Sequence, residues 1–325
     1  MSVSIWYYIT VLEIKRGKIM INTVTGKIKK ENLGATLSHE HVIWDTDEEY
    51  AYRLYFDKAY EEEKLKKQYK LLLPVFNKLY NLGCRAISET SPPIGGQNVK
   101  LMYKLSKESG VKIIPNTGWL FPKYVYRVHN EKELAKRWID DFNNGLDKIN
   151  DNVIYPGHIK LLLDKETKEA DLKMLKAAII ASKSTGMPIH CHILKAKEAS
   201  KVLDLLSKEK FDFSKFLWAH ASLEENKEVI KKAISKGAWL GFDMIKKNSY
   251  EKYYNLIKEA LNEGYGDRIL LSQDYEYYEE VINKGENNPC ASFFTDFIPY
   301  CNNKGISKDT IINIITKNPS EFYDI

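Results

Sequence analysis

Eight short apolar runs, each bounded by turn or polar residues, alternate along the chain with stretches of helical periodicity. Most of these runs are almost continuously apolar, which is typical of strands that are buried on both faces of a parallel sheet. The alternation predicts an α/β fold, a (β/α)8 TIM barrel. The predicted strands are 35–37, 84–89, 112–116, 158–163, 187–192, 216–220, 237–243 and 268–274, and the predicted helices are 61–82, 99–108, 131–149, 170–184, 196–208, 223–235 and 250–262.

A doubly wound open sheet is the alternative to a barrel. Such a sheet does not require eight units, and it predicts a glycine-rich phosphate loop after the first strand, which this sequence lacks. The length of 325 residues suggests two domains at about 150 residues per domain, but one α/β barrel commonly reaches this size. We therefore expect residues 20–325 to form a single barrel that is preceded by a short β-hairpin.

Residues 1–19 allow two hypotheses. The chain from Met20 reads as an ordinary start to a β-hairpin, and residues 14–19 back-translate to a purine-rich stretch that resembles a bacterial ribosome-binding site. On the first hypothesis Met20 is the true start and 1–19 is a translated leader. On the second, 1–19 is a genuine extension. The intact mass of the protein from its native host distinguishes the two.

Composition and charge indicate the class of partner and the compartment. The net charge of +5 is modest and spread along the chain, so no nucleic-acid partner is expected. The apolar stretch at residues 3–14 is shorter than the roughly 20 residues that span a bilayer, so no membrane partner is expected either. The four cysteines form no CxxC pair, which favours a reducing, cytoplasmic location. Four aromatic residues on the early loops predict a homodimer contact: Trp44, Tyr50, Tyr52 and Tyr55.

The positions of the histidines indicate a metal site. His39 and His41 end the first predicted strand, and side chains at i and i+2 on a strand point the same way. His192, His220 and Asp274 end the fifth, sixth and eighth strands. Since the carboxyl ends of barrel strands meet at one mouth, four imidazoles and a carboxylate converge there. This set suits zinc or a similar metal, whereas any one of these residues alone is more typical of a hydrogen-bonded loop residue.

Three further histidines are placed less clearly. His190 points the same way as His192, so it is either a ligand or a residue that contacts a ligand. His129 and His158 carry no comparable signal.

Lys160 lies within the apolar fourth strand. An inward lysine is costly unless its charge is paired or removed, and burial favours the neutral amine. A neutral amine can add carbon dioxide to give a carbamate, whose two oxygens can bridge two metal ions. The alternative is that Lys160 faces outward, toward the helices.

Several segments together identify a family resemblance. Residues 34–41, Gly-Ala-Thr-Leu-Ser-His-Glu-His, resemble the signature of the phosphotriesterase-related proteins of the amidohydrolase superfamily. The resemblance extends from about residue 21 to the end, through Lys160 and the segments 188–192, 219–220, 270–274 and 318–322. One departure is Ala-His-Ala-Ser at 219–222, where the family often has Gly-His-Ser-Asp. The ligand histidine is kept there, but the residues around it differ.

The resemblance implies two divalent metal ions, with zinc expected first and manganese, cobalt or iron as alternatives. By that resemblance His39 and His41 bind the more buried ion, and His192 and His220 bind the more exposed one. A carboxylated Lys160 bridges both ions, and Asp274 binds the buried ion and moves protons. The implied chemistry is hydrolysis by a hydroxide that bridges the two metals, with Asp274 taking the proton.

The substrate is expected to be a small polar lactone, such as a phosphorylated sugar lactone, and phosphotriester or amide hydrolysis at the same site stays open. The loop after the eighth strand, 275–289, is short and polar and leaves little wall for a long acyl chain. Lys246 and Lys247 either hold a phosphate as point charges or are simply solvated. The predicted substrate contacts are Trp119, Tyr124, Lys246, Lys247 and Tyr275.

Two other classes of protein are alternatives to this hydrolase. A TatD-like metal nuclease would place Glu, not Lys, on the fourth strand and would carry a basic track for DNA. A non-catalytic metal-binding protein of the same fold would be expected to have lost one or more ligands, and no ligand position is lost here.

Overall fold

The structure is a computed structural model that describes residues 20–325 except 46, 48, 50–52, 55–56, 58–59, 120–129 and 164–167. The two hypotheses on residues 1–19 therefore lie outside the described residues. The same holds for Tyr50, Tyr52 and Tyr55 of the predicted dimer contact and for Tyr124 of the predicted substrate contacts.

The predicted N-terminal hairpin is confirmed. Strands β1 (Ile21–Thr23) and β2 (Gly26–Ile28) pair antiparallel, with Ile21 opposite Ile28. The Val24 N–H, in the turn between them, donates to the Ile113 carbonyl at 2.9 Å. This bond ties the hairpin to a strand of the barrel.

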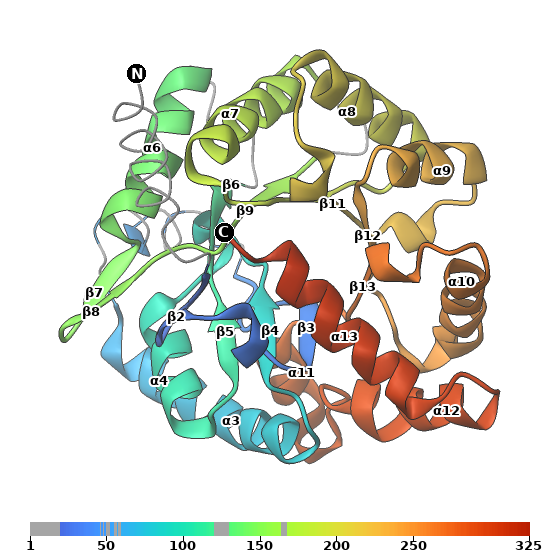
Figure 1. Cartoon of the computed structure of the whole chain (residues 1–325). Helices are drawn as coiled ribbons and strands as arrows, with labels where there is room; N and C mark the ends of the chain where they lie inside the picture. Colours follow the sequence, from blue (N-terminus) through green and yellow to red (C-terminus); the bar gives the residue numbers. More distant parts are fainter. Residues whose placement is uncertain are drawn as a thin grey trace, which may run out of the picture.

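Parallel strands form a ring with helices around it (Figure 1). In chain order the ring strands are β3 (Thr36–Glu40), β4 (Ala86–Glu89), β5 (Lys112–Ile114), β6 (Asn116–Trp119), β9 (His158–Leu162), β10 (Ile189–His192), β11 (Phe216–Ala219), β12 (Trp239–Phe242) and β13 (Ile269–Leu271). The strands β5 and β6 share one of the eight positions, because Pro115 interrupts the predicted third strand. Proline has no N–H to donate to a neighbouring strand.

Backbone hydrogen bonds close the ring between its first and last strands. The strand β5 pairs with β4, and β6 pairs with β9, so the interrupted third position still joins its two neighbours. At the other junction the Asp274 N–H donates to the His39 carbonyl at 3.1 Å, and the Tyr277 N–H donates to the His41 carbonyl at 2.8 Å. The predicted α/β barrel is therefore the fold, and its closing bonds involve three of the predicted metal ligands, His39, His41 and Asp274.

Helices surround the ring, and the last long helix runs outward from near its centre in this view (Figure 1). They are α3 (Glu62–Asn81), α4 (Val99–Ser109), α6 (Glu131–Asn144), α7 (Glu169–Thr185), α8 (Ala196–Lys208), α9 (Lys227–Ser235), α10 (Tyr250–Asn262), α11 (Tyr277–Lys284), α12 (Ile298–Asn303) and α13 (Lys308–Phe322). The ranges predicted for α8 and α10 are confirmed to the residue. The helix predicted over 223–235 begins only at Lys227, because the Asn226 side chain accepts the Glu228 N–H and caps the helix there.

Two predictions of local structure are wrong. The helix predicted to reach residue 149 ends at Asn144, because Gly145 adopts φ 91° and an additional hairpin follows, β7 (Asp147–Ile149) with β8 (Asn152–Ile154). The eighth loop is also not a plain polar loop, since it contains helix α11. Tyr277 at the start of α11 is fully buried against Phe76, and this contact between distant segments stabilises the helix.

The core lies between the strands and the helices. Ile159 and Leu161 of β9 and Met174 and Leu175 of α7 are all at most 1% exposed. Burying such side chains contributes about 1.5–3 kcal/mol each. Within the described residues, no helix has both the length and the apolar character needed to cross a membrane.

Gly118 allows β6 to approach the backbone of Lys160 in β9 closely. It is paired with Lys160 across the β6–β9 ladder, it has φ +140°, and a Cβ at this position would lie 2.0 Å from the Lys160 carbonyl oxygen. We expect Gly118→Ala to destabilise the fold by several kcal/mol, because backbone strain and an unavoidable clash add. Urea unfolding measures the effect.

Gly83→Ala is the matched control. Gly83 also has a positive φ, +104°, but a Cβ there would meet nothing within 4 Å. Its substitution should therefore cost only the strain, about 1–3 kcal/mol. Equal losses in the two variants would show that the close approach at Lys160 is not a constraint.

Candidate metal centre

The predicted metal ligands all lie toward the carboxyl ends of the ring strands. His39 is in β3, Lys160 is in β9 and His192 is the last residue of β10, while His41, His220 and Asp274 follow the ends of β3, β11 and β13. Five of these side chains line one pocket of about 180 Å³: His39, His41, Lys160, His192 and Asp274.

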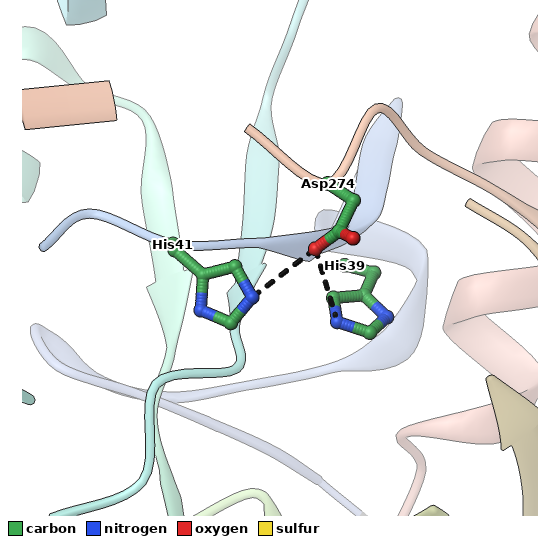
Figure 2. A group of neighbouring side chains, drawn as sticks. All are labelled: His39, His41 and Asp274. Atoms are coloured by element: carbon green, nitrogen blue, oxygen red, sulfur yellow. Dashed lines mark ion pairs between the residues drawn. The ribbon is translucent and has the colours of Figure 1, made fainter. Parts of the chain in front are cut away.

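One group of ligands surrounds the Asp274 carboxylate (Figure 2). Its Oδ1 is 3.1 Å from His41 Nε2 and 3.5 Å from His39 Nε2. Lys160 Nζ lies 3.0 Å from the same His39 Nε2. The structure thus brings an amine, a carboxylate and two imidazole nitrogens to one point, and Lys160 faces inward rather than toward the helices.

A second pair of imidazoles lies beside the first group. His192 Nδ1 and His220 Nε2 are 2.7 Å apart, and the His220 ring centroid is 4.8 Å from that of His39. The two groups therefore adjoin each other in the mouth of the barrel.

The hydrogen bonds of His41 determine which of its nitrogens faces the site. Ser91 Oγ donates to the Ile43 carbonyl at 2.6 Å, so its lone pairs remain for His41 Nδ1, which lies 2.9 Å away. The His41 Nδ1–H then donates to Ser91, and the lone pair of Nε2 points toward Asp274. A metal-binding imidazole is usually held in this way.

Asp243 performs the same task for two other histidines. Its Oδ2 is 3.1 Å from His39 Nδ1, and its Oδ1 is 2.9 Å from His220 Nδ1. Both oxygens also accept a hydrogen bond from the backbone N–H of His220. One buried carboxylate therefore turns the Nε2 atoms of His39 and His220 toward the pocket. The sequence analysis missed this residue, although it ends the predicted strand 237–243, at the same barrel end as the predicted ligands.

Two ligand residues adopt strained backbone conformations. His220 has φ 65° and Asp274 has φ 54°, in the left-handed region that costs a residue with a Cβ about 1 kcal/mol or more. In both cases the N–H of the strained residue donates to another residue of the site: to Asp243 from His220, and to the His39 carbonyl from Asp274. Such strain is typical of positions where a side chain must be aimed.

The Lys160 side chain is buried in the pocket, where the charges of Asp274, Asp243 and Glu89 act on it. It is 1% exposed, and no carboxylate of the described residues forms an ion pair with it. Burial lowers the pKa of Lys160 to about 8, so about a tenth of this side chain is neutral amine at pH 7. A neutral amine next to an imidazole nitrogen is the chemical state that can react with carbon dioxide.

The protonation states of the histidines fit metal ligands. Burial lowers the pKa of His39 and His41, and it lowers the pKa of His192 to about 2, so these imidazoles are neutral and offer lone pairs. For His220, burial acts in the same direction, but the Asp243 carboxylate outweighs it and raises the pKa. Neutral imidazoles with a carboxylate are a donor set for zinc and similar divalent metals.

Glu40, between the two histidines of β3, was also missed. Its carboxylate is fully buried and accepts hydrogen bonds from Ser272 Oγ at 2.7 Å, the Gln273 N–H at 2.8 Å and the Tyr275 N–H at 3.2 Å. These bonds hold the segment around Asp274 against β3. The sequence does indicate this position, since Glu40 stands between the predicted ligands His39 and His41 and so points to the opposite face of the strand.

The other histidines contact the site from behind or lie below it. His190 Nε2 is 3.1 Å from His39 Nδ1, so His190 contacts a predicted ligand and does not line the pocket. His158 is fully buried, with its ring 5.5 Å from that of His190. His129 lies outside the described residues.

The structure separates the predicted substrate contacts. Lys246 lines a second, wider pocket of about 610 Å³ next to the metal pocket, with its Nζ 5.0 Å from the centre of the Tyr275 ring. Tyr275 is buried behind Lys246, and Lys247 is exposed outside both pockets. Trp119 is the last residue of β6, and its side chain lies outside what the structure describes, as does all of Tyr124.

Trp44, one of the four residues of the predicted dimer contact, lies beside the metal pocket. Its ring is 4.8 Å from the His41 ring, and it lines both the metal pocket and the wider pocket. Because the other three aromatic residues of that contact are not described, the homodimer stays a prediction.

We expect Asp243→Asn to weaken metal binding by about 10–100-fold without unfolding the protein. The amide keeps the shape of the carboxylate, but it has no negative charge and only one oxygen. It therefore cannot accept hydrogen bonds from the Nδ1 atoms of both His39 and His220. Titration of metal-free protein with zinc, followed by calorimetry, measures this. Asp212→Asn is the control, since Asp212 caps a 3-10 turn before β11, away from the site. Equal zinc affinity in the Asp243 variant and the wild type would contradict the orienting role.

Comparison with known proteins agrees with the geometry. The family model described as "Phosphotriesterase family" matches residues 19–323. The chain is similar to the phosphotriesterase homology protein of Escherichia coli, at 28% identity over 89% of this chain and 98% of that protein. It is similar to the aryldialkylphosphatase of Saccharolobus solfataricus, at 24% identity over 91% and 96%, and to the phospho-furanose lactonase of Mycoplasmopsis synoviae, at 24% identity over 91% and 89%.

Proposed function

Because this chain belongs to the phosphotriesterase family of hydrolases, we propose that it is a lactonase that opens a small polar lactone at a pair of divalent metal ions. The observation that carries this proposal is the inward Lys160 next to a carboxylate and two adjoining groups of imidazoles. Proteins named for phosphotriester and for lactone hydrolysis are both among its relatives, so the family alone does not choose between these substrates.

We assign the ligands to two ions from the two groups of side chains. His39, His41 and Asp274 would hold the more buried ion, and His192 and His220 would hold the other. A carboxylated Lys160 would bridge the two. Zinc is the metal we expect, because neutral imidazoles and carboxylates are its usual ligands, while manganese, cobalt and iron fit the same set less specifically.

The chain's own residues have separable tasks in this reaction. The metal pair, when bound, supplies hydroxide at neutral pH and a Lewis acid for the carbonyl oxygen. Asp274 accepts a proton at its carboxylate and returns it to the leaving alkoxide oxygen of the lactone. Ser91 and Asp243 keep three of the imidazoles in the orientation in which their lone pairs face the site.

The size of the metal pocket favours a lactone over a phosphotriester. The described residues line a pocket of about 180 Å³ around Asp274 and Lys160, with Trp44 and Leu162 among its walls. A lactone presents its two substituents joined in one ring, whereas a phosphotriester projects three separate groups from phosphorus. A ring therefore needs fewer directions of free space at the reacting centre.

The test is a panel of three substrates on zinc-loaded protein: a 1,4-pentonolactone, a dialkyl aryl phosphate and an N-acylated amine. The proposal predicts a kcat/KM for the lactone at least about 100-fold above the other two, which corresponds to about 2.7 kcal/mol of transition-state binding. A variant with both His41 and His192 replaced by alanine controls for contaminating hydrolases. A faster reaction with the phosphate ester or the amide would overturn the lactone assignment.

A further inference from the structure

We call the wider pocket beside the metal pocket the outer pocket. It holds about 610 Å³ and shares Trp44, Asp274 and Glu276 with the metal pocket. Helices α3 and α11 pack against each other and supply its walls: Lys64 and Gln68 from α3, and Glu279, Glu280 and Asn283 from α11. A group attached to a lactone ring in the metal pocket would extend into this space.

Carboxylates outnumber ammonium groups on the walls of the outer pocket. Among the described lining residues, four carboxylates besides the proposed metal ligand Asp274 (Asp45, Glu276, Glu279 and Glu280) stand against two ammonium groups (Lys64 and Lys246). A phosphate group carries close to two negative charges at neutral pH. Its entry would therefore place like charges together, and this repulsion is only partly screened in a recessed site.

The two lysines are already engaged. Lys64 Nζ donates to Asp45 Oδ2 at 2.9 Å. Lys246 Nζ lies over the Tyr275 ring, and its charge acts on the neighbouring Glu276 carboxylate. Each lysine thus has an acidic neighbour on the same wall, and neither forms part of a cluster of positive charge.

The acidic residues are less completely compensated. Glu280 pairs with Lys284 at 2.6 Å. Glu276 and Glu279, by contrast, have no ion-pair partner in the part of the chain that the structure describes. The negative charge of this wall is therefore available to a ligand.

Gln68 supplies an independent indication of what the ligand offers. It is 2% exposed and lines the outer pocket, and its Oε1 has no hydrogen-bond partner among the described residues. A buried acceptor without a partner costs about 1–3 kcal/mol. This oxygen is itself almost inaccessible, so a small rotation of the Gln68 amide would have to bring it to a hydroxyl group of a ligand, whereas a phosphate dianion has no proton to donate.

We propose that the outer pocket binds the hydroxyl groups of an unphosphorylated substrate and selects against a phosphate at the same position. That this substrate is a lactone rests on the proposed function. The charge and the hydrogen-bond acceptors of the pocket are independent of that function. The inference replaces the sequence-based alternative in which Lys246 and Lys247 hold a phosphate.

Binding of non-hydrolysable ring analogues tests the proposal without any turnover. The probes are 1,4-anhydroribitol and its 5-phosphate, titrated into zinc-loaded protein by calorimetry. The proposal predicts that the neutral analogue binds at least about 10-fold more tightly than its phosphate, which is about 1.4 kcal/mol. Tighter binding of the phosphate would overturn it.

Variants of the pocket walls make the test specific. Gln68→Leu should weaken binding of the neutral analogue about 5–10-fold, and Glu279→Lys should strengthen binding of the phosphate by a similar factor. Glu286→Gln, which removes an exposed carboxylate outside the pocket, should change neither. If Gln68→Leu fails to fold, the partly exposed Glu279 still carries the test. An unchanged preference in Glu279→Lys would contradict the proposal.

The two proposals fail in different ways. Hydrolysis of lactones with a clear preference for the 5-phosphate would refute the outer-pocket inference and leave the lactonase standing. Binding of the neutral analogue with the predicted preference, but without hydrolysis of any lactone, would refute the lactonase and leave the outer-pocket inference standing.

Discussion

Lys160→Ala should weaken metal affinity and slow turnover, each by at least about 100-fold, and the metal content of the purified protein should fall with the affinity. The loss of a bridging ligand should exceed the 10–100-fold effect that is typical of a partner that only orients a ligand. The side chain lies 3.0 Å from His39 Nε2 at the junction of the two ligand groups. Its removal leaves the imidazoles in place but takes away the anion that would join two ions. Elemental analysis and lactone turnover, measured on the same preparation, check the expected losses.

Lys215→Ala is the matched control for Lys160→Ala. Lys160 is fully buried and Lys215 is partly buried, but Lys215 lies in the turn that precedes β11, at the amino end of that strand, where its Nζ donates to the Asp324 carbonyl at 2.6 Å. Its removal should not change metal content. A further arm reconstitutes metal-free wild type in buffer with and without bicarbonate. Equal metal uptake in the two buffers, or unchanged metal in Lys160→Ala, would contradict the carbamate bridge.

Asp274→Asn should cut kcat by about 10²–10⁴-fold while most of the metal stays bound. The amide retains an oxygen near His41 Nε2 but cannot accept the proton of the reaction. The substitution also suits the backbone, since asparagine tolerates the left-handed conformation at φ 54° and its N–H can still donate to the His39 carbonyl. Steady-state kinetics on protein of known metal content measures the effect.

The outcome separates two tasks of Asp274. A fall in kcat at constant metal content and nearly constant KM supports proton transfer. Turnover within a few-fold of wild type would contradict that task. A loss of metal in parallel with activity would assign Asp274 to metal binding alone. Asp296→Asn, an exposed carboxylate in the described part of the chain, serves as the control.

Much of the fold and of the centre could be predicted because the signals are local. Apolar runs such as His158–Leu162 identify strands that are buried on both faces, and helices such as α8 and α10 have clear boundaries in the sequence. The ligand positions follow from one topological rule, that the carboxyl ends of barrel strands meet. That rule brought His39 close to His220, 181 positions apart in the chain by subtraction, without any knowledge of their contacts.

The features that could not be predicted depend on contacts between distant segments. Helix α11 forms where a loop was expected, because Tyr277 packs on Phe76 of α3. The place of Trp44 against His41 and the unpartnered oxygen of Gln68 likewise appear only when helices and loops are packed. Asp243 is the exception, since it ends a predicted strand. A prediction that starts from histidines misses this carboxylate, which orients two of them.

The most direct test of this account is the metal content per chain of wild-type protein purified without chelator. Two neighbouring groups of imidazoles joined by Lys160 and Asp274 predict two equivalents of divalent metal, zinc before manganese, cobalt or iron. One equivalent or none, after incubation with zinc and bicarbonate, would contradict a bridged metal pair in this barrel.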